Sequence, residues 1–456
     1  MTFSHPLNII VLAAGKGTRM KSETPKVLHA AAGRSLVEWV LAAAEGLAPE
    51  RLHVVIGPES ESRIDDLPWA KPGSWSVQRD RKGTGHAVQQ AADALSGASG
   101  YTLVLYADTP LVTTAALRAL VEDTIADNAD VALTVFEAQE PGGYGRIVLD
   151  DEGRPLEIVE AKDATPAQRE ITLCNGGLML ARTEVLFDLL AQTTDSNAAG
   201  EYYITDIVGL ARKAGLRTRA SQFDPSLLAG VNSRRELAAV EAVLQDRLRA
   251  ALMDGGVTMI APETVTLSYD TQVGADTIIE PNVFFGTGVV VGSGCRLRAG
   301  SYFEGAQVGE DVIVGPMARL REGTVLSDTV KVGNFVEIKK AHLHAGAKAP
   351  HLTYVGDADV GERANLGAGT ITCNYDGINK HRTTIGAGAF IGSNAALVAP
   401  LTIGDGALVG AGSTITEDVP ANAIVTTRGP TKTKENAAER YRERLRAIKA
   451  RLNAQK

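Results

Sequence analysis

The stretch QVGADTIIEPNVFFGTGVVVGSGCRLRAGSYF, residues 272–303, carries an aliphatic or aromatic side chain at every sixth position. These positions are Val273, Ile279, Phe285, Val291, Leu297 and Phe303. A sustained hexapeptide period is typical of a parallel β-helix, in which each coil buries a ladder of aliphatic side chains and glycines occupy turns that other residues would strain. We therefore predict a β-helix in this part of the chain.

The same period continues toward the C-terminus. With three faces per coil, a six-residue period corresponds to about 18 residues per coil. The register breaks between Ile338 and Val360 and again around residues 374–384, and we expect a loop to project from the coil at both breaks. The later members of the pattern are Val308, Val314, Leu320, Leu326, Val332, Ile338, Val360, Leu366, Ile385, Ile391, Leu397, Ile403, Val409 and Ile415.

The residues before the repeats alternate short apolar runs with helical patterns, which predicts an α/β domain with a parallel sheet and crossover helices. Residues 234–253 place apolar side chains three and four apart and stop at a Gly-Gly pair, which predicts a connecting helix. We expect an α/β domain over residues 1–230, a linker helix over 231–254, and a β-helix domain with a helical tail over 255–456. The expected strands are 8–15, 51–57, 101–108 and 130–137, and the expected helices are 35–46, 85–97 and 113–127.

Composition agrees with this division and limits the partners. Of the 47 glycines, 20 lie in residues 1–230 and 27 in residues 255–429, where their density is higher. The formal net charge of −8 gives no global electrostatic case for nucleic-acid binding. Three cysteines without CxxC spacing favour a reducing compartment. Because no basic leader and no run of about 18 apolar residues is present, we expect a soluble cytoplasmic protein without a membrane partner.

The C-terminal segment, residues 431–456, is locally basic. It contains nine Lys or Arg and three Glu, and part of it has a helical pattern. A solvated helix, or one that packs on the end of the coil, is favoured over a nucleic-acid-binding segment.

The loop after the first expected strand reads LAAGKGTRM, residues 12–20, and is followed by Pro25-Lys26. It matches neither a P-loop nor GxGxxG, because Ile10 and Met20 stand where those motifs need glycine. A glycine loop that leaves a buried strand still exposes backbone N–H groups, and Arg19 and Lys26 add positive charge suited to a triphosphate. The combination favours a phosphate-binding loop over a plain turn.

The period also places polar residues of the second half. Arg321 and Lys339 are 18 residues apart, so they are expected on adjacent coils at the same azimuth. Two stacked cations repel unless an anion lies between them, which indicates a phosphate site. Ser393 and Ala411 stand in the same relation and align small residues along a groove. Spacing alone does not distinguish His351 from the other histidines of the chain.

Several stretches resemble a known enzyme family. LAAGKGTRMKSETPKVL is similar to nucleotidyltransferases that make nucleotide sugars from sugar 1-phosphates. QRDRKGTGHAV and NGGLM resemble the uridylyltransferase that forms UDP-N-acetylglucosamine, and NFVEIKKA, HLTYVGDA and NLGAGTITCNYDG look like acetyltransferase motifs. Over nearly its whole length the chain resembles the bifunctional bacterial uridylyltransferase/acetyltransferases.

This resemblance implies a Rossmann-like nucleotidyltransferase domain, a linker helix and a left-handed parallel β-helix. It also implies two reactions in series. Acetyl-CoA would acetylate glucosamine 1-phosphate, and UTP would then convert the product to UDP-N-acetylglucosamine, a cell-wall and lipopolysaccharide precursor, with release of pyrophosphate. The family forms homotrimers with the acetyl site at the subunit interface.

For the first half, the resemblance implies that Arg19 and Lys26 are catalytic and that Asp108 and Asn232 hold Mg²⁺. Asp108 also follows the apolar run LVLY, at the end of a strand where α/β sheets bind ligands, although a cap before Pro110 is an alternative. The family usually has glycine in place of Ala107, so its methyl group would crowd the nucleotide slightly. The implied UDP-N-acetylglucosamine site is Leu12, Ala13, Ala14, Gly15, Lys26, Gln78, Gly83, Thr84, Tyr106, Asp108, Gly145, Glu160, Asn175 and Asn232.

For the second half, the resemblance implies that His351 is the general base and that Glu337 orients it. Acetyl transfer to an amine needs such a base, and histidine serves near pH 7. Glucosamine 1-phosphate would be bound by Arg321, Lys339, Tyr354, Asn365 and Lys380. Acetyl-CoA would be bound by Ala368, Asn374, Tyr375, Ser393, Ala411 and Arg428.

Two other functions remain open at this point. One is a monofunctional sugar-1-phosphate nucleotidyltransferase whose β-helix serves only assembly, and the other is a hexapeptide-repeat scaffold with a degenerate front domain. The Arg321/Lys339 pair with His351 argues against the first, and Asp108 with Asn232 against the second. We interpret Cys174 and Cys373 as buried small side chains rather than redox groups.

Overall fold

The computed structural model describes residues 3–454 and divides into two compact units. The first comprises the chain up to Ala251 together with Thr266–Tyr269, and the second comprises Leu252–Val265 and the residues from Asp270 onward. The division lies within helix α8 (Arg234–Asp254). Over residues 3–454, no helix combines the length and the apolar character needed to cross a membrane.

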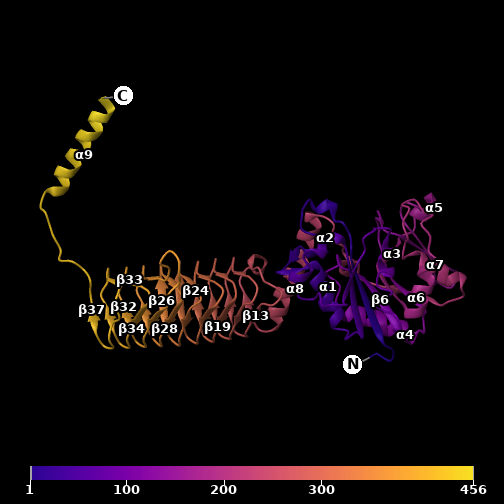
Figure 1. Ribbon diagram of the computed structural model, residues 1–456, viewed down its shortest axis with the longest axis horizontal. Helices are drawn as coiled ribbons and strands as arrows, with labels where there is room; N and C mark the ends of the chain where they lie inside the picture. Colours follow the sequence, from indigo (N-terminus) through magenta and orange to yellow (C-terminus); the bar gives the residue numbers. More distant parts are fainter. Residues whose placement is uncertain (1–2, 455–456) are drawn as a thin grey trace. The chain divides into compact units, whose positions relative to one another are not determined.

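The first unit is built on one large sheet, with helices packed against it (Figure 1). Its order is β11-β7-β10-β6-β1-β4-β5, with the hairpin β8–β9 attached to β10. Strand β10 runs antiparallel to both of its neighbours, so the sheet is mixed. The prediction of a parallel sheet is therefore wrong for this strand. The strands are β1 (Leu7–Ala13), β4 (Arg51–Ile56), β5 (Trp75–Val77), β6 (Tyr101–Tyr106), β7 (Val131–Glu137), β8 (Arg146–Leu149), β9 (Pro155–Val159), β10 (Leu173–Arg182) and β11 (Thr218–Gln222), with a short pair β2 (Ala30–Ala31) and β3 (Arg34–Ser35) beside them.

Helices cover both faces of this sheet because β1 is apolar on both sides. Ile9 and Val11 pack with α1 and α4, whereas Ile10 and Leu12 pack with α3, α6 and α7. Continuous burial of this kind is expected for a central strand of an α/β sheet. The helices are α1 (Leu36–Glu45), α2 (Pro58–Glu61), α3 (Thr84–Gln89), α4 (Thr114–Ala126), α5 (Pro166–Arg169), α6 (Thr183–Leu190) and α7 (Asp206–Lys213), with 3₁₀ turns at Thr18–Met20, Lys26–Leu28, Ile64–Asp66 and Pro225–Leu228.

The predicted strands and most predicted helices of this unit are confirmed, with one exception. Helix α3 ends at Gln89, and the following residues up to Gly97 form turns, so the helix predicted over 85–97 is too long. Helix α8 is packed into the first unit, since Val240 and Leu244 are buried against Leu36 and Leu111.

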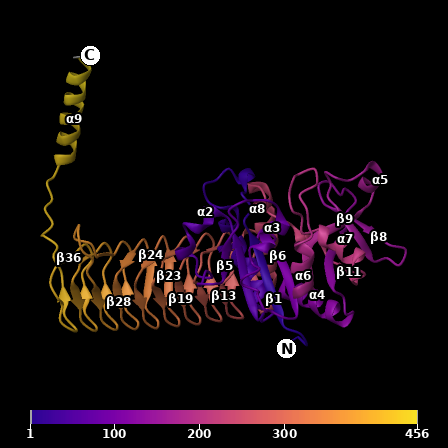
Figure 2. The same cartoon turned by 45° about the vertical axis from the view of Figure 1, so that its right-hand side comes forward.

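The second unit is a parallel β-helix whose strands form three ladders (Figures 1 and 2). The first ladder contains β12 (Thr258–Met259), β14 (Ile278–Ile279), β17 (Arg296–Leu297), β20 (Ile313–Val314), β23 (Lys331–Asn334), β26 (Lys348–His351), β29 (Asn365–Leu366), β32 (Phe390–Ile391), β35 (Leu408–Val409) and β37 (Ile424–Val425). The second contains β13 (Gln272–Val273), β16 (Val290–Val291), β19 (Ala306–Val308), β22 (Thr324–Leu326), β25 (His342–Leu343), β28 (Ala358–Val360), β31 (Thr383–Ile385) and β34 (Leu401–Ile403). The third contains β15 (Phe284–Phe285), β18 (Tyr302–Phe303), β21 (Arg319–Leu320), β24 (Glu337–Lys339), β27 (Tyr354–Gly356), β30 (Ile371–Cys373), β33 (Ala396–Val398) and β36 (Thr414–Ile415).

The predicted hexad positions form the core of this coil, and from Ile279 onward each of them is buried. One predicted loop is wrong. Between Ile338 and Val360 the ladders continue without interruption, since Ile338 pairs with Val355 and Leu343 with Val360. Each of these coils is 17 residues long because one of its corners is one residue shorter. The second predicted loop is confirmed, because Asp359 pairs with Thr384 after an intervening excursion closed by a Tyr375–Lys380 bridge.

The basic C-terminal segment forms helix α9 (Ala437–Ala454), as the sequence predicts. Its apolar residues Tyr441, Leu445, Ile448 and Leu452 are exposed. The helix is therefore solvated in the isolated chain.

Candidate active sites

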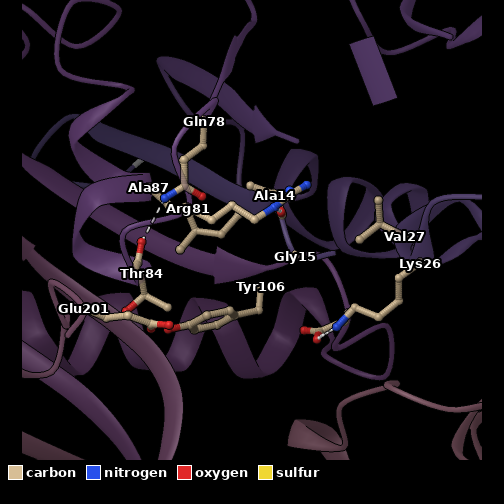
Figure 3. Close-up of a pocket in the computed structure, with 13 residues that line it drawn as sticks. Ala14, Gly15, Lys26, Val27, Gln78, Arg81, Thr84, Ala87, Tyr106 and Glu201 are labelled. Carbon is tan, nitrogen blue, oxygen red and sulfur yellow. Dashed lines mark hydrogen bonds and ion pairs between the residues drawn. The ribbon is translucent and has the colours of Figure 1, made fainter. Parts of the chain in front are cut away.

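A cavity of about 210 Å³ lies in the first unit, where β1 and β6 end (Figure 3). Gln78, Arg81 and Thr84 lie at one end, Lys26 lies at the other, and Tyr106 lies between them. Nine of the predicted nucleotide-sugar residues line it, namely Leu12, Ala14, Gly15, Lys26, Gln78, Gly83, Thr84, Tyr106 and Asp108. The cavity therefore joins the phosphate-suited loop to the segment after β5.

At one end of the cavity, the Lys26 ammonium group contacts two side-chain oxygen atoms. Lys26 Nζ lies 2.5 Å from Asp108 Oδ2 and 3.0 Å from Asn232 Oδ1, and the Lys26 side chain is buried. A backbone hydrogen bond from Val231 N to Asp108 O, 2.8 Å long, brings Asn232 beside Asp108. Two hard oxygen atoms thus converge on one positive charge, and this donor set also fits Mg²⁺.

At the opposite end of the cavity, Arg81 is paired with Glu59, and the other polar side chains there include the neutral Gln78 and Thr84. Gln78 Nε2 donates to Gly83 O at 3.0 Å, which fixes the side-chain amide over the loop. Burial, reinforced by the charges of Glu160 and Asp108, raises the pKa of Tyr106, so its phenol remains protonated. This end suits an uncharged heterocycle more than a phosphate.

The remaining residues predicted for this site fall into three places. Gly145, Glu160 and Asn175 lie together beyond the cavity, since Asn175 N donates to Gly145 O at 2.8 Å and a Cβ at Gly145 would lie 3.6 Å from Glu160 Oε1. Ala13 is buried in the core. Arg19 lies outside the cavity, in a basic recess with Lys21, Arg234 and Arg235.

In the second unit, three cations converge on the third ladder. Arg319 pairs with Glu337, 18 residues on, which stacks Arg321 on Lys339 as the period predicts. The charges of Arg321 and Lys380 lower the pKa of Lys339. Arg321 also donates to Glu337 Oε1 at 2.7 Å. The cluster carries more positive charge than its own carboxylate neutralises, as a phosphate site requires.

Another set of predicted residues forms a column along one corner of the coil. His351 ends β26, and Ala368, Ser393, Ala411 and Arg428 follow successive strands of the first ladder. The glycines before Ala368, Ser393 and Ala411 are needed, because a Cβ at Gly367 would lie 2.5 Å from Ser393 N and one at Gly392 would lie 2.4 Å from Ala411 N. At about 4.8 Å per rung, four steps from His351 to Arg428 give a column roughly 19 Å long.

The remaining predicted residues of the second unit lie on the first ladder, the third ladder and the excursion after β30. Tyr354 begins β27 on the third ladder, whereas Asn365 begins β29 on the first. Asn374 is buried and donates to Asp357 Oδ2 at 2.5 Å, with Tyr354 Oη 3.4 Å from its amide. Tyr375 is exposed on the excursion that it forms with Lys380. One chain therefore spreads the residues predicted for the acetyl site over two adjacent faces.

Comparison with known proteins agrees with this two-part organisation. Residues 9–256 match the MobA-like NTP transferase domain, and residues 270–305 and 382–417 match the six-repeat bacterial transferase hexapeptide. A protein named "Bifunctional protein GlmU" from Jannaschia sp. (strain CCS1) is 51% identical over 449 residues, covering 97% of each chain. Proteins of the same name from Paramagnetospirillum magneticum and Sphingopyxis alaskensis are each 50% identical over 98% of this chain and 99% of their own.

The chain belongs to the GlmU family. The hexapeptide match and the three parallel ladders together identify the coil as the left-handed β-helix of these transferases.

One departure from the GlmU pattern has a different effect from the one predicted. Ala107 is fully buried in the core beside β1 and does not line the cavity. Its backbone N donates to Leu12 O at 3.0 Å, so the methyl group points into the core. The prediction that this methyl group crowds a nucleotide is wrong.

Ala107→Gly should therefore lower stability without changing nucleotide affinity. Loss of one buried methyl group and the added freedom of the unfolded chain together cost about 1–2 kcal/mol. Urea unfolding followed by tryptophan fluorescence measures this, because all three tryptophans, Trp39, Trp69 and Trp75, lie in the first unit. A changed KM for UTP with an unchanged unfolding midpoint would contradict the placement.

The structure also corrects the partner of His351. His351 Nδ1 lies 2.8 Å from Asn334 Oδ1, whereas Glu337 is bonded to Arg321. The Asn334 carbonyl oxygen can only accept, so Nδ1 carries the proton and Nε2 retains the lone pair that a base needs. His351 is exposed, as access to a substrate requires.

Arg81 is a residue of this GlmU-family cavity that sequence reasoning missed. Its Nε donates to Ala14 O at 2.8 Å and its Nη2 bonds to Glu59. Arg81 therefore ties the segment after β5 to the loop after β1. It stands within the family-like run QRDRKGTGHAV, but its contacts join residues 67 and 22 positions away, which local sequence does not show.

Proposed function

We propose that the chain is a bifunctional enzyme of UDP-N-acetylglucosamine synthesis. It acetylates glucosamine 1-phosphate with acetyl-CoA and then transfers uridylyl from UTP to N-acetylglucosamine 1-phosphate, releasing pyrophosphate. The observation that supports the proposal is the presence, in one chain of the GlmU family, of a cavity in the NTP transferase domain and of an exposed histidine, His351, on the hexapeptide-repeat coil.

For acetyl transfer, the proposed roles follow from the column and the cation cluster. Arg321, Lys339 and Lys380 hold the sugar phosphate. The column from Ala368 to Arg428 binds the extended arm of acetyl-CoA. The amine nitrogen attacks the thioester carbonyl, the C–S bond breaks, and His351 Nε2 takes the proton from nitrogen. Coenzyme A leaves as its thiolate, which the proton taken up by His351 can then neutralise.

For uridylyl transfer, positioning and charge stabilisation supply most of the catalysis. Gln78 and the Gly83-Thr84 segment bind the uracil, and Gly145, Glu160 and Asn175 bind the sugar. A phosphate oxygen of the sugar 1-phosphate attacks the α-phosphorus of UTP, and the bond to pyrophosphate breaks. Lys26 and Arg19 balance the charge on the phosphates. Mg²⁺ on Asp108 and Asn232 would neutralise the remaining phosphate charge.

The proposed assembly is a homotrimer in the cytoplasm. Outward-facing apolar side chains on two ladders, among them Ile371, Phe390 and Leu408, are exposed in the single chain, and such surfaces favour association. A second copy would also enclose acetyl-site residues that one chain leaves on separate faces. Three free thiols and the use of UTP and acetyl-CoA support a cytoplasmic location.

The direct test uses the purified full-length protein. Coenzyme A release is measured with acetyl-CoA and glucosamine 1-phosphate, and pyrophosphate release is measured with UTP and N-acetylglucosamine 1-phosphate. Both activities are expected. Pyrophosphate release without coenzyme A release would instead support a nucleotidyltransferase with a structural β-helix, and coenzyme A release alone would refute the uridylyltransferase half.

Arg81→Ala should raise the KM for UTP about tenfold, because it removes a charged hydrogen bond worth about 1.5 kcal/mol that fixes the nucleotide loop. Acetyl transfer should not change. Arg79→Ala is the matched control, since Arg79 forms an exposed pair with Glu61 and its side chain is 68% accessible. Equal effects of the two substitutions on KM would contradict the positioning role of Arg81.

A further inference from the structure

Two histidines and an aspartate, residue types that can bind metals, lie together on the second ladder. None of them is among the residues of the two proposed active sites. His342 and His344 are two residues apart at β25, so both imidazoles project from the same side of the strand. Asp359 in β28 pairs in register with His342 on the next coil. The stacking of coils therefore brings two imidazoles and one carboxylate together on one outer face.

The distances within this cluster are close to those of a metal site. His344 Nε2 lies 3.1 Å from Asp359 Oδ1, and the two imidazole centroids are 3.9 Å apart. One ligand atom from each of the three residues lies within 4.8 Å of the other two. In a tetrahedral zinc site with bonds of about 2.0–2.1 Å, neighbouring ligand atoms are about 3.3 Å apart. The His344–Asp359 edge, at 3.1 Å, is already close to this length, and a bound ion would draw His342 to the same distance.

Two neighbouring side chains hold the ligands in place. Ser327 Oγ lies 2.9 Å from His342 Nε2, and with that nitrogen donating, Nδ1 keeps its lone pair. Arg382 donates to Asp359 Oδ2 at 3.1 Å and leaves Oδ1 directed at His344. Outer hydrogen bonds to a ligand histidine and a ligand carboxylate are the usual support of a metal site.

The charge of the cluster suits a cation bound by neutral imidazoles. Asp359 supplies the one carboxylate of the three residues, and an imidazole binds a metal through a ring nitrogen that carries no proton. His344 and Asp359 are 40% and 31% accessible, which leaves a path for an ion and room for a water ligand. Arg382 opposes an added cation, so the affinity should be moderate.

We propose that His342, His344 and Asp359 form a binding site for Zn²⁺ or a similar divalent transition metal, with water in the fourth position. Imidazole with carboxylate is a donor set that favours Zn²⁺ over Mg²⁺. The ion would link two successive coils of the β-helix.

The test uses Co²⁺ as a spectroscopic substitute for Zn²⁺, added to the full-length protein in excess Mg²⁺. One equivalent should bind with visible d–d bands, and Zn²⁺ should displace it. His344→Gln should weaken Co²⁺ binding at least tenfold, and His342→Asn should do the same. Circular dichroism and the unfolding midpoint without metal show whether each variant is folded.

His381→Gln is the matched control for metal binding. His381 pairs with Asp376 at 2.7 Å, and over residues 3–454 it belongs to no group of three possible metal ligands. Its replacement should leave the Co²⁺ spectrum and affinity within twofold of wild type. Absence of the bands in wild type, their persistence in folded His344→Gln, their loss in His381→Gln, or thiolate charge-transfer bands would each overturn the proposal.

Discussion

His351→Ala should lower the kcat of acetyl transfer about a thousandfold and leave uridylyl transfer within twofold of wild type. A positioned general base contributes about 10²–10⁴ in rate, and His351 Nε2 is the nitrogen left with a lone pair by the bond from Nδ1 to Asn334. The side chain is exposed, so its loss should not disturb the hexad core. Coenzyme A and pyrophosphate release, measured on the same preparation, give the two rates.

Asn334→Ala separates the base from its orientation. It should reduce acetyl transfer less, by about tenfold, because Nε2 remains but the tautomer is no longer fixed. Acetyl transfer should be faster in Asn334→Asp than in Asn334→Ala, because the Asp carboxylate also accepts a hydrogen bond from His351 Nδ1. Full acetyl transfer in His351→Ala, or loss of both activities in a folded protein, would contradict the assignment.

Asp108→Asn should lower uridylyl transfer about a thousandfold, equivalent to about 4 kcal/mol, with acetyl transfer unchanged. The substitution keeps the shape of the side chain but removes the negative charge that holds Lys26 Nζ at 2.5 Å. Lys26 would remain buried without its carboxylate, and the proposed metal would lose its charged ligand.

Asp80→Asn is the control for that substitution, because Asp80 lies on the segment after β5 with its side chain 76% accessible. It should leave both activities within twofold. Binding of Mg²⁺ with UTP, followed by calorimetry, should weaken in Asp108→Asn and not in Asp80→Asn. Uridylyl transfer that survives in Asp108→Asn would exclude a central role for this carboxylate.

The sequence predicts the β-helix well because burial follows its period directly. It misplaces one loop for an identifiable reason. Between Ile338 and Val360, the coil positions that continue the hexad ladder are Leu343, Ala349 and Val355, and all three are fully buried. The shortened corners make some spacings between successive inward-facing residues five instead of six. Ala349 is also too small to be recognised as part of an apolar pattern. A shorter coil and an inserted loop therefore give the same sequence signal.

The sites are only partly predictable from the sequence. Strand ends locate Asp108, and the 18-residue spacing locates Arg321 over Lys339. Contacts across the fold are not local, however, since Lys26 meets Asn232 at a separation of 206 residues. His351 contacts Asn334 at a separation of 17 residues. This contact is predictable from the sequence only if the coil is known to contain 17 residues rather than 18.

The unequal corners of the coil also bear on how this protein can vary. Neighbouring rungs of 17 and 18 residues keep their strands in register, because the difference is absorbed where the chain turns. A deletion at such a corner leaves each side chain on its own face, whereas a deletion inside a strand would exchange the inner and outer residues. The number of residues per coil can therefore change at the corners, while the residues on each ladder keep their order and their faces.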